Sequence, residues 1–206
     1  MSKREPIKTT IKEIVDYWTI QIDECELSVD WEDAHQRCWR CGCKAGLERC
    51  HIVPDSLGGK DEPSNFVLLC KRCHADGPNV EDPEIMWDWL NAYKVSFYDS
   101  FWTIVGKKEY EFIYGQSFDN DLKRILERSK KEKDKKDILE LENEKLLHAL
   151  EKTGIHFGQP YFNTATVAGV LRMMLKDIAK ELEVDFPFKD KKENQKQPWW
   201  VKYVFN

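Results

Sequence analysis

Residues 37–74 decide the fold of this chain, and they read RCWRCGCKAGLERCHIVPDSLGGKDEPSNFVLLCKRCH. Two cysteine pairs with the same short spacing, Cys38 with Cys41 and Cys70 with Cys73, stand at either end of this stretch. Each pair brings two thiols to one side of a tight turn, and two such turns complete a tetrahedral set of four sulfurs. Because thiolates are soft ligands that suit Zn²⁺, the spacing predicts a structural zinc site, with unligated cytosolic thiols as the alternative. Such a site contributes on the order of 10–16 kcal/mol of apparent binding energy.

The other three of the seven cysteines have different predicted roles. In a chain expected to be cytosolic, cysteines are more typical of metal ligands or thiols than of a disulfide framework. Cys43 and Cys50 could each replace a member of the zinc set, although Cys43 follows Cys41 so closely that we expect it to lie outside. Cys25 lies in the acidic N-terminal segment of residues 1–36 and is predicted to be a small buried apolar residue.

The segment between the cysteine pairs predicts a hairpin and a helix. RCHIVP (49–54) and NFVLLC (65–70) are short apolar runs that favour β structure, and a turn-rich loop with Gly58-Gly59 separates them. This pattern indicates two antiparallel strands joined by an Ω-like loop. A helix that carries His74 is expected to follow directly.

The positions of His51, Asn65 and His74, with the flanking HIVP, GG and LLC-x-x-CH features, resemble those of the HNH endonucleases. The resemblance covers about residues 37–80, and the cysteine pairs match the zinc-stabilised branch of that family. It implies a ββα-metal fold that hydrolyses phosphodiester bonds of DNA with one divalent ion. By the same resemblance His51 is the general base, Asn65 orients its imidazole through a hydrogen bond, and His74 binds the catalytic metal.

The sequence departs from the family at Cys50, because the residue before the base is often a His or Asp that binds the metal. A thiolate is a poor ligand for Mg²⁺ and a better one for softer ions. Two roles therefore stay open for Cys50. It ligates a softer catalytic ion, or it is a spectator while Glu48 or Asp55 joins His74 around Mg²⁺ or Mn²⁺.

The charge of the whole chain differs from the charge of this stretch. The net charge of −5 and the pI of about 5.6 argue weakly against a nucleic-acid partner. Residues 37–74, however, carry a net charge of +3 between two acidic segments, which is compatible with a polyanion. The cluster of basic residues there predicts phosphate contacts, and solvated surface charge is the alternative for each one. They are Arg37, Arg40, Lys44, Arg49, Lys60, Lys71 and Arg72.

The rest of the chain predicts helices around this module, so the expected class is α+β and mainly α. Apolar residues at helical spacing predict a helix in about residues 8–27, and Asp82-Pro83 is typical of a helix start. Further helices are expected before Thr153-Gly154 and from Thr164 to Leu182, and the final PWWVKYVFN is expected to be a docked strand or an interface element. The predicted divisions are an N-terminal helical segment (1–36), the zinc-stabilised nuclease core (37–80), a helical and aromatic segment packing on it (81–120), and a helical C-terminal region for specificity or dimerisation (121–206).

The predicted function is that of a metal-dependent HNH endonuclease acting on double-stranded DNA, of a restriction or phage-defence type. One active site cuts one strand, so double-strand cleavage would imply a homodimer or two encounters. The alternatives are a zinc-stabilised DNA-binding module without activity, suggested by Cys50, and a nuclease acting on RNA. No apolar run approaches a spanning helix and MSKREPIKTT lacks a signal-peptide core, which predicts a cytoplasmic protein without a membrane partner.

Overall fold

The computed structural model describes residues 6–23, 27–92, 97–129 and 135–188. The chain forms two compact units, Met1–Val105 and Gly106–Asn206, and helix α4 (Phe101–Tyr114) contains the division between them. None of the described helices combines the length and the apolar character that a membrane crossing requires. Cys25 and the C-terminal PWWVKYVFN lie outside the described residues.

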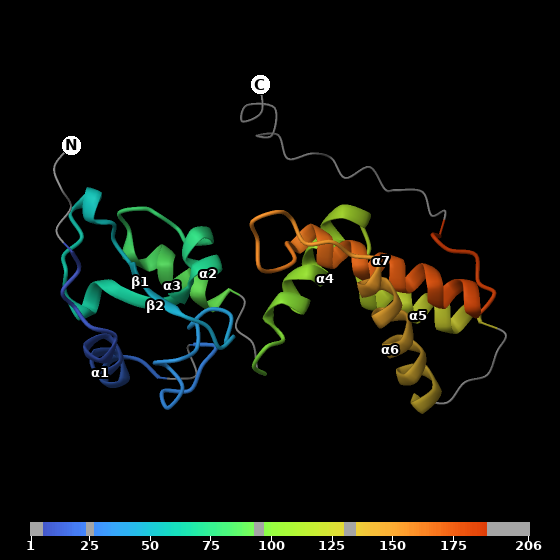
Figure 1. Ribbon diagram of the computed structural model, residues 1–206, viewed down its shortest axis with the longest axis horizontal. Coiled ribbons are helices and arrows are strands. Elements are labelled where there is room, and N and C mark those ends of the chain that lie inside the picture. The colour runs from blue at the N-terminus through green and yellow to red at the C-terminus, as the bar shows by residue number, and fades with distance from the viewer. Residues whose placement is uncertain (1–5, 24–26, 93–96, 130–134, 189–206) are drawn as a thin grey trace, which may run out of the picture. The chain divides into compact units, whose positions relative to one another are not determined.

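The first unit contains a two-stranded antiparallel hairpin followed at once by a helix (Figure 1). Strand β1 (Leu47–His51) pairs with β2 (Phe66–Cys70) in a register that sets His51 opposite Phe66. Two short 3-10 turns, η2 (Asp55–Leu57) and η3 (Pro63–Asn65), shape the connection, and α2 (Lys71–Asp76) begins where β2 ends. This order of elements is the predicted ββα module.

The two strands differ in burial because they face different surroundings. Every residue of β2 is buried, as expected for the continuous apolar run FVLLC, whereas only Cys50 is buried within β1. The turn from β2 into α2 is fixed by Cys70, whose Sγ accepts a hydrogen bond from the Cys73 amide at 3.5 Å. Cys70 therefore ends the strand, caps the helix and belongs to the four-cysteine cluster described below.

Helices α1 (Ile11–Gln21) and α3 (Pro83–Asn91) contribute to the core of this unit. Helix α1 contacts β2 and η3, and its Trp18 donates a hydrogen bond from Nε1 to the Phe66 carbonyl oxygen at 2.8 Å. The helix is shorter than the predicted 8–27: a capping box of Thr10 and Glu13 fixes its start, and it ends where the backbone becomes extended at Ile22. The expected start of α3 is confirmed, since the Asp82 side chain accepts from the Glu84 amide and Pro83 stands in the first turn.

The second unit is helical. Helices α5 (Phe118–Arg128), α6 (Lys135–Glu151) and α7 (Thr164–Glu181) enclose a separate apolar core with the last part of α4. Within it Tyr110 and Arg172 both donate hydrogen bonds to the buried carboxylate of Asp121, at 2.6 and 3.1 Å. The predicted class, mainly helical with a small sheet, is confirmed.

Candidate active site

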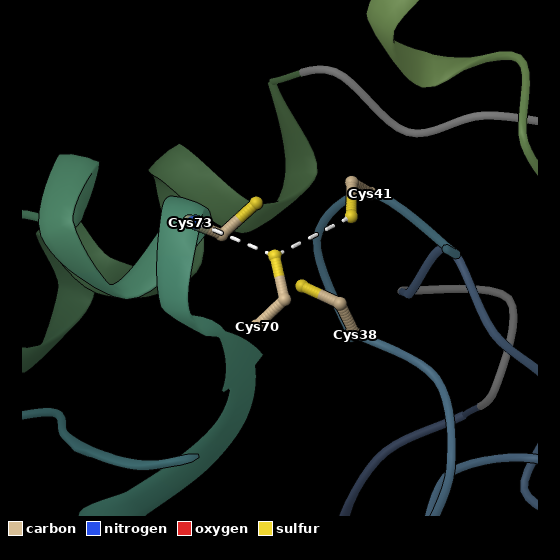
Figure 2. Close-up of side chains that lie close together, drawn as sticks. All are labelled: Cys38, Cys41, Cys70 and Cys73. Atoms are coloured by element: carbon tan, nitrogen blue, oxygen red, sulfur yellow. Dashed lines mark hydrogen bonds between the residues drawn. The ribbon is translucent and has the colours of Figure 1, made fainter. Parts of the chain in front are cut away.

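Four cysteine side chains of the first unit meet in one buried cluster (Figure 2). Their Sγ atoms all lie within 4.8 Å of one another, a spacing at which a single metal ion can bind all four. The set consists of the four predicted cysteines, Cys38, Cys41, Cys70 and Cys73. Hydrogen bonds from the thiols of Cys38, Cys41 and Cys73 hold the pKa of Cys70 well below its ordinary value. Four buried thiolates would repel one another strongly, and a divalent cation removes that repulsion, so the donor set fits a metal.

Cys43 and Cys50 lie outside this cluster. Cys43 is half-buried, and its Sγ donates to the Cys41 carbonyl oxygen at 3.6 Å. The Cys50 thiol is buried and donates to the His51 carbonyl oxygen at 3.6 Å. Burial, with smaller contributions from Cys38 and Glu48, raises the pKa of Cys50 to about 12. Cys50 is therefore a neutral thiol in the absence of a bound cation.

A cleft of about 1110 Å³ opens beside the hairpin and α2. Both predicted catalytic histidines and Cys50 line it, together with the carboxylates Asp55 and Asp61. Among the described residues on its wall there is no lysine or arginine, so the side chains at this cleft favour a cation over an anion.

Separate contacts orient the two histidines of the cleft. The His51 ring lies against the buried Phe66 ring, with 4.5 Å between the ring centroids and 50° between the planes. The His74 Nδ1 lies 2.7 Å from the Oε2 of Glu48, which projects from β1. Side chains from β1 and α2 thus line one space, as general acid–base chemistry on a bound ligand requires.

Asn65 closes the loop between the strands. Its Oδ1 accepts from the Val53 amide at 2.9 Å, and its Nδ2 donates to the carbonyl oxygens of Val53 and Lys60 at 3.0 and 2.9 Å. The loop packs so closely here that a Cβ on Gly59 would lie 1.7 Å from the Val53 oxygen. These bonds place Asn65 as a clamp that fixes the backbone immediately after His51. The hydrogen bond from Asn65 to the His51 imidazole, which the family resemblance implies, stays a prediction.

The family model described as HNH endonuclease matches residues 36–76, which are the residues that build this cleft and the cysteine cluster. The chain carries an HNH domain. A curated relative, "Probable mobile endonuclease C" of Enterobacteria phage T4, is 29% identical over 97 residues. The aligned part is 44% of this chain and 41% of the relative, so the chain matches less than half of that protein's length. No solved structure matches the chain.

Replacing Asn65 by alanine is expected to destabilise the HNH domain by about 2–4 kcal/mol, because three side-chain hydrogen bonds are lost and the Val53 amide loses its acceptor. Thermal or urea unfolding of the full chain measures the effect. Asn91→Ala, at the exposed end of α3, is the matched control and should change stability by less than about 0.5 kcal/mol. Equal stability of the two variants would contradict the clamp.

A strap of residues 6–9 lies along the HNH cleft, and no pattern in the sequence predicted it. Pro6 and Ile7 line the cleft directly. On one side of the strap, Arg49 donates from Nη1 to the carbonyl oxygens of Ile7 and Thr9, at 3.3 and 2.8 Å. On the other, the Asp61 carboxylate accepts from the amides of Lys8 and Thr9, at 2.7 and 3.2 Å. Arg49, predicted as a phosphate contact, thus holds the strap that lies along the cleft.

The other predicted phosphate contacts divide into two groups. Three arginines place their guanidinium groups over aromatic rings within the unit: Arg37 over Tyr98 at 3.9 Å, Arg40 over Trp89 at 3.8 Å and Arg72 over Trp102 at 3.0 Å. Such stacking stabilises the fold of the HNH unit. The three lysines, Lys44, Lys60 and Lys71, are exposed. The exposed lysines are therefore the stronger candidates for contacts with a phosphate backbone.

Proposed function

We propose that the protein is a metal-dependent endonuclease that hydrolyses phosphodiester bonds of double-stranded DNA in the cleft of its HNH domain. The observation that carries the proposal is the convergence of His51 and His74 on one cleft within the matched domain. The name of the phage relative supports the same reaction class. The exposed Lys44, Lys60 and Lys71 would contact the flanking phosphates.

In this proposal His51 accepts a proton from a water molecule, and the water oxygen forms a new bond to phosphorus. The bond from phosphorus to the leaving oxygen breaks, and that oxygen takes up a proton from solvent. A neutral imidazole suits the proton transfer near neutral pH. Phe66 restrains the His51 ring, and the Asn65 clamp restrains the backbone that follows it.

We propose two ions of different character, each held by its own donor group. The four-thiol cluster is proposed to hold a structural Zn²⁺, since thiolates are soft ligands. A second divalent ion, held by His74, would supply Lewis-acid stabilisation of the scissile phosphate. Within the described residues the cysteine set is the one group of three or more suitable side chains gathered this tightly. The ion at His74 would therefore keep several water or phosphate oxygens as ligands, as Mg²⁺ and Mn²⁺ commonly do.

The experiment is cleavage of a supercoiled plasmid by the purified full chain, with Mg²⁺, Mn²⁺, Co²⁺ or Ni²⁺ added or omitted. Leaving out the added ion is preferred to adding a chelator, because a chelator would also remove a metal bound at the cysteine cluster. We expect products only with an added ion, and nicked circles ahead of linear DNA would indicate one strand cut per encounter. Linear product without a nicked intermediate would support a homodimer. Labelled duplex DNA, single strands and structured RNA in competition identify the substrate.

A DNA-binding module without hydrolytic activity is the second candidate, because a buried neutral thiol stands at Cys50. It predicts binding to duplex DNA with no cleavage under any of the four ions. The name of the phage relative favours a mobile endonuclease as the biological role. The restriction or phage-defence role stays a prediction from the sequence.

Substitution of Cys50 separates its two proposed roles. A thiol is not a ligand that Mg²⁺ prefers, so we expect Cys50→Ala to retain Mg²⁺-dependent cleavage within about threefold of the unmodified protein. With Co²⁺, a softer ion, a larger loss is expected if the thiolate joins the site. Initial rates under both ions measure the effect, and Cys43→Ala is the matched control. A loss of more than about tenfold with Mg²⁺ would contradict the spectator role.

A further inference from the structure

We propose that Glu48 is a positioning residue that fixes the tautomer and the orientation of His74. The inference rests on the proposed function, in which His74 holds the catalytic ion. It starts from one contact between two elements of the HNH domain. The Oε2 of Glu48 on β1 lies 2.7 Å from the Nδ1 of His74 on α2.

The hairpin places Glu48 where it can reach the helix. Glu48 and Cys50 are two residues apart on β1, so their side chains leave the strand on the same face. Helix α2 contacts β1, and Cys50 and His74 both line the cleft. The pair therefore joins the strand to the helix at the edge of the site.

The chemistry of the pair decides which nitrogen of His74 can bind a ligand. An ionised carboxylate only accepts hydrogen bonds, so a neutral imidazole facing it must carry its proton on Nδ1. Nε2 then keeps the lone pair that metal coordination requires. In free neutral histidine the proton resides more often on Nε2, which would block that atom. Glu48 thus selects the minor tautomer.

Exposure is consistent with a positioning role. The side chains of His74 and Glu48 are 38% and 46% exposed, so water screens their attraction and the pair adds little to folding stability. Tautomer selection needs only a modest free-energy difference between two protonation sites. The role of this contact is therefore to set the tautomer and orientation of His74, and its loss should leave the fold unchanged.

The test compares Glu48→Ala with Glu48→Gln in the full chain, with no divalent ion added. Long-range ¹H–¹⁵N NMR of histidine-labelled protein reports which ring nitrogen carries the proton, and the chain has only five histidines. A His74→Asn sample assigns the signals. We expect His74 to be protonated on Nδ1 in the unmodified protein and in Glu48→Gln, whose amide oxygen still accepts that proton. In Glu48→Ala the proton is expected to move largely to Nε2.

Cleavage rates and the ion concentration for half-maximal activity give the second readout. Glu48→Ala should lose about 10–100-fold, and Glu48→Gln should recover a large part of that loss. Glu111→Ala and Glu111→Gln, on the exposed surface of α4, are controls for the loss of an acidic side chain. Each should leave both readouts unchanged.

Two results would overturn the inference. One is an unchanged His74 tautomer in Glu48→Ala. The other is equal loss in Glu48→Gln and Glu48→Ala with the tautomer intact, which would make Glu48 a direct ligand of the ion. A tautomer shift in a protein that cleaves nothing under any ion would support the positioning role and refute the nuclease proposal, so the two failures are distinguishable.

Discussion

Cys70→Ser is expected to unfold the first unit of the chain. Cys70 ends β2, accepts the hydrogen bond that starts α2, and contributes one of four sulfurs that lie within 4.8 Å of one another. A structural zinc site supplies about 10–16 kcal/mol, as much as the whole stability of a typical domain, about 5–15 kcal/mol. Removing one thiolate weakens that binding and leaves the remaining buried thiols without compensation. The lost binding free energy should therefore exceed the stabilisation that the apolar core of the unit supplies.

The measurement combines zinc content by elemental mass spectrometry with amide NMR of the full chain. We expect loss of about one bound zinc and collapse of the β1, β2 and α2 signals. The signals of the second unit, which has its own core, should persist. Cys43→Ser is the matched control, because Cys43 lies outside the cluster and should leave zinc content and fold unchanged. A folded Cys70→Ser variant without zinc would contradict the structural role of the site.

Local patterns predicted the framework of this domain. The four cysteines, the two strands and the helix with His74 follow from short spacings and short apolar runs, which local geometry controls. Asp82 and Pro83 predicted the start of α3 for the same reason, since a cap acts within one helical turn. Such features depend on neighbours that are close in the chain.

The contacts that the arginines make could not be predicted from local patterns. Arg40 and Arg72 stack on Trp89 and Trp102, partners that the fold brings from a later segment. Arg49 holds the strap through backbone oxygens, and no side-chain pattern encodes that contact. The net charge of +3 in residues 37–74 therefore includes arginines that stabilise the unit rather than line the cleft. Charge counted along a sequence does not show where each charge is used.

Asn65 and Glu48 illustrate a second limit of sequence-based prediction, which is that one residue type at one position is compatible with several roles. An asparagine between a turn and a strand is compatible with a loop clamp and with an imidazole partner, and the amide group can serve both. The hydrogen bonds to Val53 and Lys60 establish the clamp. Glu48 was one of two acids considered as metal ligands from its position, but only the fold shows its carboxylate at Nδ1 of His74.

His51→Ala is expected to remove nearly all cleavage while leaving the fold intact. General-base catalysis by a histidine contributes about 10²–10⁴-fold, and initial rates on supercoiled plasmid should fall by that factor. The His51 ring is half-buried and lines the cleft, so its truncation removes little apolar packing from the core. Thermal unfolding and zinc content should therefore match the unmodified protein, which separates a chemical effect from a structural one.

The matched control for this prediction is His35→Ala, an exposed histidine of the same unit that does not line the cleft. It should cleave at the unmodified rate under every ion tested. Equal cleavage by His51→Ala and His35→Ala would remove His51 as the base. If activity then remained dependent on added ion and on His74, the proton would have to leave through another group lining the cleft, and Asp55 and Asp61 would be the acids to substitute next. One of these carboxylates would then be the proposed general base, and His74 would remain the proposed ligand of the catalytic ion.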